Sequence, residues 1–217
     1  METLYKVLGS NGKPYHGGAG TWSLPSSDGP GDWMPPMEVI PCRSGYHLCR
    51  GAKHLIHWLG PEIYAAESRG EVVEAENKVV AAEARLICRI ETWNERVARL
   101  FAADCAEHVL HIFEAVYPND KRPREAIEAA RKYARGEISA EELRVYANAV
   151  YDARQTYYTT NYASYAAADA AYYATTNAAG VTYFAAYYAR AFSVSSRAVE
   201  RQWQVEKLRQ YLSGKIQ

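Results

Sequence analysis

The chain lacks a net charge, a long apolar run and the pattern of a secretory leader. Its 25 basic and 25 acidic residues cancel over 217 positions, so no global field draws it to nucleic acid or to an anionic membrane surface. A membrane-spanning helix needs about eighteen or more apolar residues in a row. The nearest candidate, residues 162–192, consists mainly of alanine and is interrupted by Asp169 and Arg190. We therefore expect a cytoplasmic protein with neither membrane nor nucleic acid as its partner.

Cysteine is also scarce, and the N-terminus shows no basic segment followed by an apolar one. In a cytoplasmic chain the cysteines are expected to be reduced thiols rather than a disulfide framework. There are four, at Cys42, Cys49, Cys88 and Cys105.

Residues 1–91 have the alternating apolar and polar residues, and the residue types favoured in tight turns, that are typical of a β-rich module. Asn11-Gly12 is a dipeptide that tolerates positive φ at both centres of a type I′ turn, which predicts a hairpin between residues 4–8 and 14–16. Residues 17–36 are dense in Gly, Pro, Ser and Asp and predict an irregular loop anchored by Trp22 and Trp33. Residues 37–40 and 45–49 predict short strands. In residues 78–91 one face is apolar and the other charged, which predicts a strand covered on one side, with its apolar face at Val80, Ala82, Ala84, Leu86, Cys88 and Ile90.

From residue 92 onward the apolar residues recur at helical spacing. Thr92 with Glu95 and Ser139 with Glu142 fit capping boxes, in which hydroxyl and carboxylate satisfy each other's backbone amides. Pro123 suits a first helical turn, and Gly136 suits the residue that follows a helix. Residues 92–217 are therefore expected to form a helical domain.

A long helix from Ser139 to about residue 178 is expected to carry the most unusual pattern in the chain. One stripe has tyrosines spaced by seven, and the opposite side consists of alanines that allow close packing of helices. The tyrosine stripe comprises Tyr151, Tyr158, Tyr165 and Tyr172. A last helix should bury one seam, which includes Ala198, Val205 and Leu208, and leave charged residues such as Glu200 in solvent.

Together these patterns predict an α+β protein. A small mixed or antiparallel β module, residues 1–91, would be followed by an Ala/Tyr-rich α-helical array, residues 92–217.

The chain also resembles known families in two parts. The segments YKVLGSNGKPYHGG and PCRSGYHLCR look like an uncharacterised N-terminal domain of bacterial and phage proteins. The segments ETWNERVARLFAADCAEHVL and ERQWQVEKLRQYLSG resemble a helical family named for immunity proteins. The second resemblance implies a role in binding a protein partner, by association with the family's name.

The N-terminal order of residues is also similar to small ADP-ribosyltransferase folds. That resemblance would give His16 and Tyr46 the roles of holding the nicotinamide ribose and ring, in an enzyme or a degenerate NAD-binding module in residues 1–92. The carboxylate that such a site requires has no matching context, because Glu83 and Glu91 are expected on the solvent face. The alternative is structural, with His16 closing a hairpin and Tyr46 packing in the sheet.

Two groups of Cys and His residues have the chemistry of metal ligands without a matching spacing. Cys42, His47, Cys49, His54 and His57 fit no common zinc pattern. In the second group, Cys105 and His108 border an apolar helix face and His111 rotates away, so a core histidine beside a buried thiol is expected. We therefore expect no metal site and no cofactor.

The function predicted from these features is a non-enzymatic protein-interaction or self-assembling module, immunity-like and associated with a phage or mobile element. Its partner would be another protein or a second copy of the chain, because Tyr-rich surfaces favour protein contacts. The predicted interface residues are Tyr158, Tyr162, Tyr165, Tyr172 and Tyr187.

Overall fold

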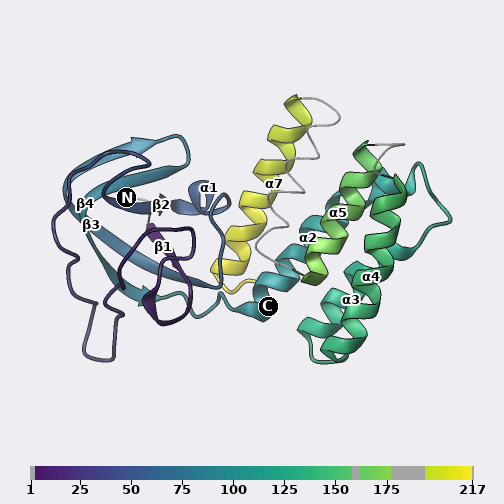
Figure 1. The fold of residues 1–217 in the computed structure, drawn as a ribbon, viewed down its shortest axis with the longest axis horizontal. Coiled ribbons are helices and arrows are strands. Elements are labelled where there is room, and N and C mark those ends of the chain that lie inside the picture. Colours follow the sequence, from purple (N-terminus) through teal and green to yellow (C-terminus); the bar gives the residue numbers. More distant parts are fainter. Residues whose placement is uncertain (1–2, 158–161, 177–193, 217) are drawn as a thin grey trace. The chain divides into compact units, whose positions relative to one another are not determined.

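The computed structural model describes residues 3–157, 162–176 and 194–216 (Figure 1). The chain divides into two compact units, Met1–Asn94 and Glu95–Gln217. The first is built on four antiparallel strands and the second on helices, which confirms the α+β class. In the part of the chain that is described, every helix is too short or too polar to cross a membrane.

The strands of the first unit close into a small barrel in the order β1-β2-β4-β3. A hairpin of the two longest strands, β3 and β4, supplies most of the wall, and the short strand β1 closes it by pairing with both β2 and β3. Irregular pairing of β3 with β4 between Arg69 and Val72 lets the long hairpin curve. The strands are β1 (Leu4–Leu8), β2 (Tyr46–Arg50), β3 (Glu62–Ala75) and β4 (Lys78–Arg89).

The predicted turn at Asn11-Gly12 is confirmed, but the hairpin around it is reduced to one bridge. Asn11 has φ 61° and Gly12 φ 73°, the conformation expected of this dipeptide. Beyond the turn only Leu8 and Pro14 pair. A side chain at position 12 would place its Cβ 2.6 Å from the carbonyl oxygen of Trp22, so glycine is required there for space as well as for φ.

The irregular loop runs beside β4 and is held by both predicted aromatic anchors. The backbone amides of Gly31 and Met34 donate to the carbonyls of Leu86 and Ala84, each at 2.9 Å. Trp22 is buried in the barrel core. Trp33 contacts guanidinium groups on both long strands, at 4.2 Å from Arg69 and 4.8 Å from Arg85.

Two strand predictions need correction. Residues 37–40 form no strand; Met37 instead donates its amide to Ala82 on β4, as the rest of the loop does. On β4, Val80, Ala84 and Leu86 are buried as predicted, but Cys88 is exposed. The strand extends past the covered part of the sheet at this end, so alternation alone does not bury its last residues.

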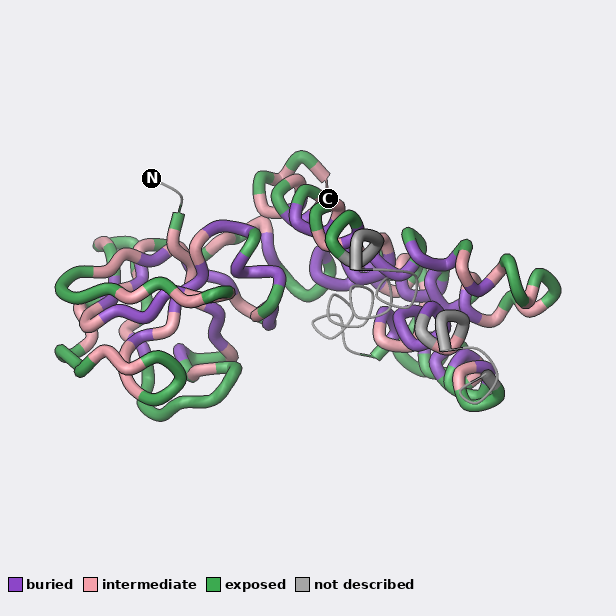
Figure 2. Tube along the Cα trace, turned by 90° about the horizontal axis from the view of Figure 1, so that it is seen from above, coloured by how far each residue is buried: buried purple, intermediate pink, exposed green. Residues whose placement is uncertain are grey.

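In the second unit, α2 to α5 pack against one another and α7 contacts α2. Figure 2 shows that the buried residues lie on the inner faces of these helices. The core includes Phe101, Phe113 and Ile127. The helices are α2 (Glu95–Glu114), α3 (Arg122–Ala134), α4 (Ala140–Tyr157), α5 (Tyr162–Thr176) and α7 (Val194–Leu212).

The helix-end signals succeed at α3 and α4 and fail at α2. The Ser139 amide donates to Glu142 Oε2 at 2.8 Å, and the Glu142 amide donates to Ser139 Oγ at 3.2 Å, which confirms the second capping box. Gly136 follows α3 with φ 73°. The helix α2 begins at Glu95 itself, so the cap predicted at Thr92 is wrong.

The predicted long helix is two helices. α4 ends at Tyr157, and α5 begins at Tyr162 and packs against α4. The physical reason is burial: a single straight helix would leave its alanine face in water, whereas the reversal places Ala167, Ala170 and Ala174 inside the unit, each at most 1 % exposed.

In α7 the buried seam is shifted from the predicted one. Val205 and Leu208 are buried as expected, but Ala198 is exposed. Glu200, predicted to be solvated, is only 5 % exposed because its carboxylate contacts His108 and Gln204. The seam residues from 177 to 193, and the side chains of residues 194–197, lie outside the described part.

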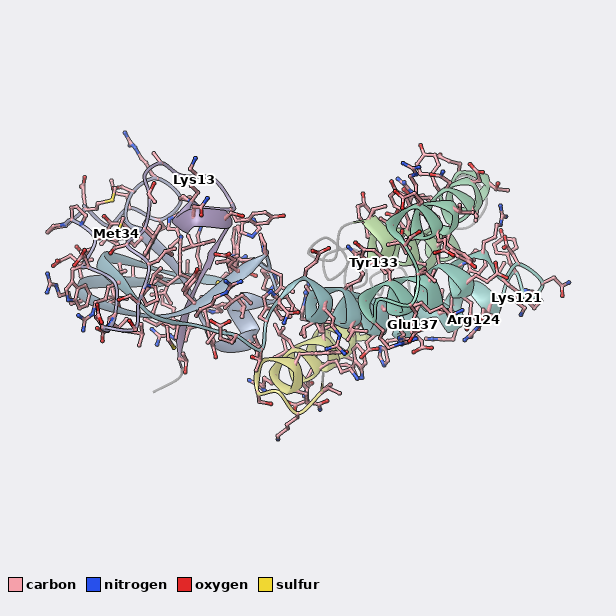
Figure 3. All side chains as sticks on the ribbon, turned by 90° about the horizontal axis from the view of Figure 1, so that it is seen from below. Lys13, Met34, Lys121, Arg124, Tyr133 and Glu137 are labelled. Carbon is pink, nitrogen blue, oxygen red and sulfur yellow. The ribbon has the colours of Figure 1, made fainter. Side chains whose placement is uncertain are left out.

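One carboxylate connects three helices. Asp104 on α2 accepts from Arg131 on α3 at 2.7 Å, and from Tyr211 on α7 at 2.9 Å. Lys207 adds an ion pair at 3.0 Å. A second pair, in which Arg124 donates two bonds of 2.7 Å to Glu114, joins α2 to the start of α3 (Figure 3). The α2–α3 contact is therefore polar at its edges and apolar between them.

Replacing Ser139 by alanine is expected to lower the free energy of unfolding of the helical unit by about 1 kcal/mol, because the Glu142 amide loses its acceptor. Ser139→Asp, which keeps a capping oxygen, is the matched control. Urea unfolding followed by circular dichroism measures both. An alanine variant as stable as the wild type would show that the box contributes nothing.

The Asp104 network is expected to make the protein acid-labile. Burial alone would raise the pKa of Asp104, but bonds from Arg131, Lys207 and Tyr211 outweigh it and hold the pKa below its usual range. This carboxylate therefore stabilises the fold above its unfolded pKa and loses that contribution as the pH falls through its folded pKa. Asp104→Asn should cost about 1–3 kcal/mol at pH 7 and flatten the acid limb of the stability curve. An unchanged pH profile would contradict the assignment.

Candidate functional site

The most unusual polar contact of the helical unit is a buried ion pair between α4 and α5. Arg154 Nε lies 2.5 Å from Asp169 Oδ1, and the Asp169 side chain is 1 % exposed. A buried carboxylate without a cation would be strongly unfavourable, so the two charges require each other. Because each charge is on a different helix, the pair also fixes how α4 and α5 align.

Four tyrosines surround this pair and form what we call the tyrosine cluster: Tyr151, Tyr165, Tyr172 and Tyr173. The Arg154 guanidinium lies 5.2 Å from the ring centres of Tyr151 and Tyr172, and 5.7 Å from that of Tyr165. The rings of Tyr151 and Tyr172 lie 5.6 Å apart across the two helices. Tyr172 also contacts Tyr173 edge-on, at 5.4 Å.

The electrostatics of the cluster keep its arginine charged. Burial would lower the pKa of Arg154, but the Tyr165 hydroxyl and the Asp169 carboxylate outweigh burial and raise it. The pKa of Tyr173 is also raised, by burial and by the nearby Asp169. Tyr173 therefore stays neutral at physiological pH. The rings and hydroxyl groups of the four tyrosines are partly accessible to solvent. Tyr151 is 41 % exposed, and the other three are half-buried.

The structure brings together two of the five predicted interface tyrosines. Tyr165 and Tyr172 belong to the tyrosine cluster, together with Tyr151 from the same predicted stripe. They meet across two helices rather than along one. Tyr158 and Tyr187 lie outside the described residues, as does the side chain of Tyr162.

His16 and Tyr46 both have structural partners in the barrel unit. His16 Nε2 donates to the carbonyl oxygen of Trp58 at 2.7 Å. The Tyr46 ring is buried with its centre 5.4 Å from that of Trp22, and its hydroxyl donates to Pro35 O at 2.7 Å. Burial, followed by the charge of Glu83, raises the pKa of the Tyr46 hydroxyl. Both side chains line a pocket, but the atoms that would hold a ribose already have bonds.

Neither candidate carboxylate completes a transferase site. Glu83 accepts two bonds from Arg69, and Glu91 is exposed. Among the described residues that line the pocket beside His16 and Tyr46, none is acidic. The three chemical groups of an ADP-ribosyl site are therefore not assembled here.

The Cys and His residues also do not converge. Among the described residues, no group of three or more His, Cys, Asp or Glu side chains could hold a metal ion. Cys105 is fully buried as predicted, but His108 is exposed rather than a core histidine. Its ring stacks on Trp203 at 3.8 Å, and its Nδ1 lies 2.5 Å from Glu200 Oε2. His111 is exposed, as its position on the helix predicts.

The Arg154–Asp169 pair is not among the contacts predicted from the sequence. Both residues are visible as rare charges in an Ala/Tyr-rich stretch, and an isolated charge of each sign in such a stretch is a signal for a buried pair. The two are fifteen positions apart, so the signal could be used only if the helix were known to reverse between them.

Replacing Asp169 by alanine is expected to destabilise the helical unit by about 3–5 kcal/mol, because it leaves Arg154 without its counter-charge. The double variant Arg154→Met/Asp169→Leu, which removes both charges, should recover most of that loss. Urea unfolding of Arg154→Met, Asp169→Leu and the double variant completes the cycle. A single variant within 1 kcal/mol of the wild type would mean that water already solvates the pair.

Comparison with known proteins identifies the helical part of the chain. Neither curated proteins nor solved structures gave a match. A family model described as "Imm-5 like putative immunity protein" matches residues 89–211. This is more than half of the chain, and it contains the tyrosine cluster and the Asp104 network. The chain belongs to the Imm-5 like immunity protein family.

Proposed function

We propose that the protein acts as a non-enzymatic immunity protein that neutralises a protein toxin by binding it through the tyrosine cluster. The single observation that carries this is the position of the cluster: a half-exposed group of four tyrosines and an arginine in the unit that the family model covers. Tyr and Arg are the residues that most often dominate protein–protein affinity.

The internal contacts of the cluster favour binding. Ordering a mobile side chain at an interface costs about 0.5–1.5 kcal/mol. Here Arg154 is already held by Asp169, and the tyrosine rings pack on Arg154 and on one another. A partner would therefore meet a largely ordered surface. Asp169 neutralises the charge of Arg154, so a partner would be attracted by the tyrosine rings and hydroxyl groups rather than by net charge.

A non-enzymatic role also agrees with how the polar groups of this unit are used. The half-buried Asp104 and the buried Asp169 and Glu200 each contact a cation or an amide inside the unit. Cys105 is fully buried, and burial raises the pKa of its thiol well above the usual range. These groups are held as structural partners, and Cys105 lacks the reactive thiolate that nucleophilic catalysis needs.

Neutralisation by binding should be stoichiometric. A toxin selected by its ability to arrest growth, and to be rescued by this chain, would be titrated with the purified protein. Its activity should reach zero at equimolar addition. Complete neutralisation by a few per cent of an equivalent would contradict the proposal, because only a catalyst could achieve it.

Tyr151→Ala is expected to weaken toxin binding by about 2 kcal/mol, roughly thirtyfold in Kd, as for an interface hot spot. Val199→Ala is the matched control, because Val199 is a 66 % exposed apolar residue on α7, away from the cluster's helices. Calorimetry gives Kd, and circular dichroism shows that both variants are folded. Equal Kd values for the wild type and Tyr151→Ala would place the binding surface elsewhere.

Self-association through the same cluster stays a prediction of the sequence. Light scattering over micromolar concentrations tests it, and Tyr151→Ala should shift any dimer toward monomer if the cluster is the contact. A monomer at all concentrations leaves the whole cluster free for the toxin.

A further inference from the structure

The barrel unit contains two adjoining pockets that the immunity role does not use. The smaller has a volume of about 60 Å³ and the larger about 400 Å³. Lys6, His16, Gly17 and His47 line both. Met34, labelled in Figure 3, lies on the irregular loop and contributes to the wall of the larger pocket. The larger volume is within the range of small-molecule sites.

Charges of one sign gather at these pockets. Lys78 lines the smaller one and Arg43 the larger one, in addition to the shared Lys6. Among the described residues that line either pocket, none is an aspartate or glutamate. In a chain whose charges cancel overall, this local imbalance is a property of the site.

The other cations of the barrel are arranged differently. Each of four arginines has a glutamate across the sheet within salt-bridge distance: Arg50–Glu74, Arg69–Glu83, Arg85–Glu67 and Arg89–Glu62. The two pocket lysines instead have neutral neighbours. Lys6 Nζ donates to the carbonyl oxygen of His47 at 3.1 Å, and Lys78 Nζ donates to Cys42 Sγ at 3.1 Å. Four glutamates therefore balance the outer arginines, and neither pocket lysine has an ion pair among the described residues.

Two polar groups at the pockets, on Lys6 and His47, are in an energetically unfavourable environment. Burial lowers the pKa of Lys6 to about 8, so its charged form is held in an unfavourable setting. His47 Nε2 is buried and has no hydrogen-bond partner among the described residues. A buried polar atom of this kind normally has a protein or ligand partner. The pKa of His47 is also lowered, by burial and then by the charges of Lys78 and Lys6, which line the smaller pocket together with it.

We propose that these two pockets form a binding site for a phosphate-bearing small molecule. The phosphate group would lie near Lys6, Lys78 and His47, where it supplies the missing counter-charge and a partner for Nε2. A phosphate suits this set better than a carboxylate does, because it offers more charge and more acceptor oxygens to several separated donors. The larger pocket exceeds the size of a phosphate, and Met34, Met37 and Tyr46 give it an apolar wall for an organic part.

The site does not depend on the proposed immunity role. Its lining residues all belong to the barrel unit, outside the residues that the family model matches. Toxin neutralisation and phosphate binding can therefore fail or succeed separately.

The test is calorimetry of the full-length protein with inorganic phosphate, acetate, two phosphomonoesters (AMP and glucose 6-phosphate) and their uncharged counterparts (adenosine and glucose), at constant ionic strength. We expect saturable binding of phosphate, and no binding of the counterparts. Lys6→Met and Lys78→Met, which keep the length of the side chain, should each weaken phosphate binding by about tenfold or more. Lys13→Met is the matched control, because Lys13 is an exposed lysine of the same unit (Figure 3).

Three results would overturn the proposal. The first is the absence of saturable phosphate binding by a folded protein at millimolar phosphate. The second is an equal loss in Lys13→Met and Lys6→Met, which would indicate general screening of surface charge. The third is tighter binding of acetate than of phosphate, which would assign the site to carboxylates. Circular dichroism of each variant shows that the fold is intact, and the His47 ring signals in NMR should shift on phosphate addition if Nε2 is a contact.

Discussion

The ion pair between Arg154 and Asp169 determines the arrangement on which the candidate binding surface depends. A carboxylate that is 1 % exposed cannot remain charged without a cation beside it. The only way for Arg154 to reach Asp169 is for the chain to reverse, so that α4 and α5 run antiparallel. That reversal also brings Tyr151 against Tyr172 and buries the alanines of α5. The tyrosine cluster is thus a consequence of one pairing.

Local signals in the sequence predicted the structure well where a few neighbouring residues decide it. The Ser139–Glu142 capping box, Gly136 after α3 and the Asn11-Gly12 turn all form as expected, because each depends on backbone geometry within four residues. The α+β class could also be predicted, because the spacing of apolar residues changes near residue 92 from the alternation of strands to the spacing of helices. At Thr92 the same kind of capping signal failed, because α2 begins three residues later, at Glu95.

Contacts between distant residues decided the rest, and a single sequence does not reveal them. A heptad of tyrosines fits one long helix and two antiparallel helices equally well. The choice depends on what covers the alanine face, and that is settled by α2, α3 and α4 together. Glu200 has the spacing of a solvated helix residue, yet its partners are on α2, nearly a hundred positions earlier, and one turn along α7. For the candidate site, the sequence predicted that tyrosines would form it but not that they would group around Arg154 and Asp169.

The two units use charge in opposite ways, and this separates their functions. In the helical unit the half-buried Asp104 and the buried Asp169 and Glu200 each have a partner nearby, and the rings of the tyrosine cluster lie around the Arg154–Asp169 pair. In the barrel the glutamates pair with arginines on the strands, and the lysines at the pockets have only neutral neighbours. Lysines that have no ion pair among the described residues contribute little to the stability of a barrel whose core is apolar. Such lysines are better explained by an anion that the protein binds than by the needs of the fold.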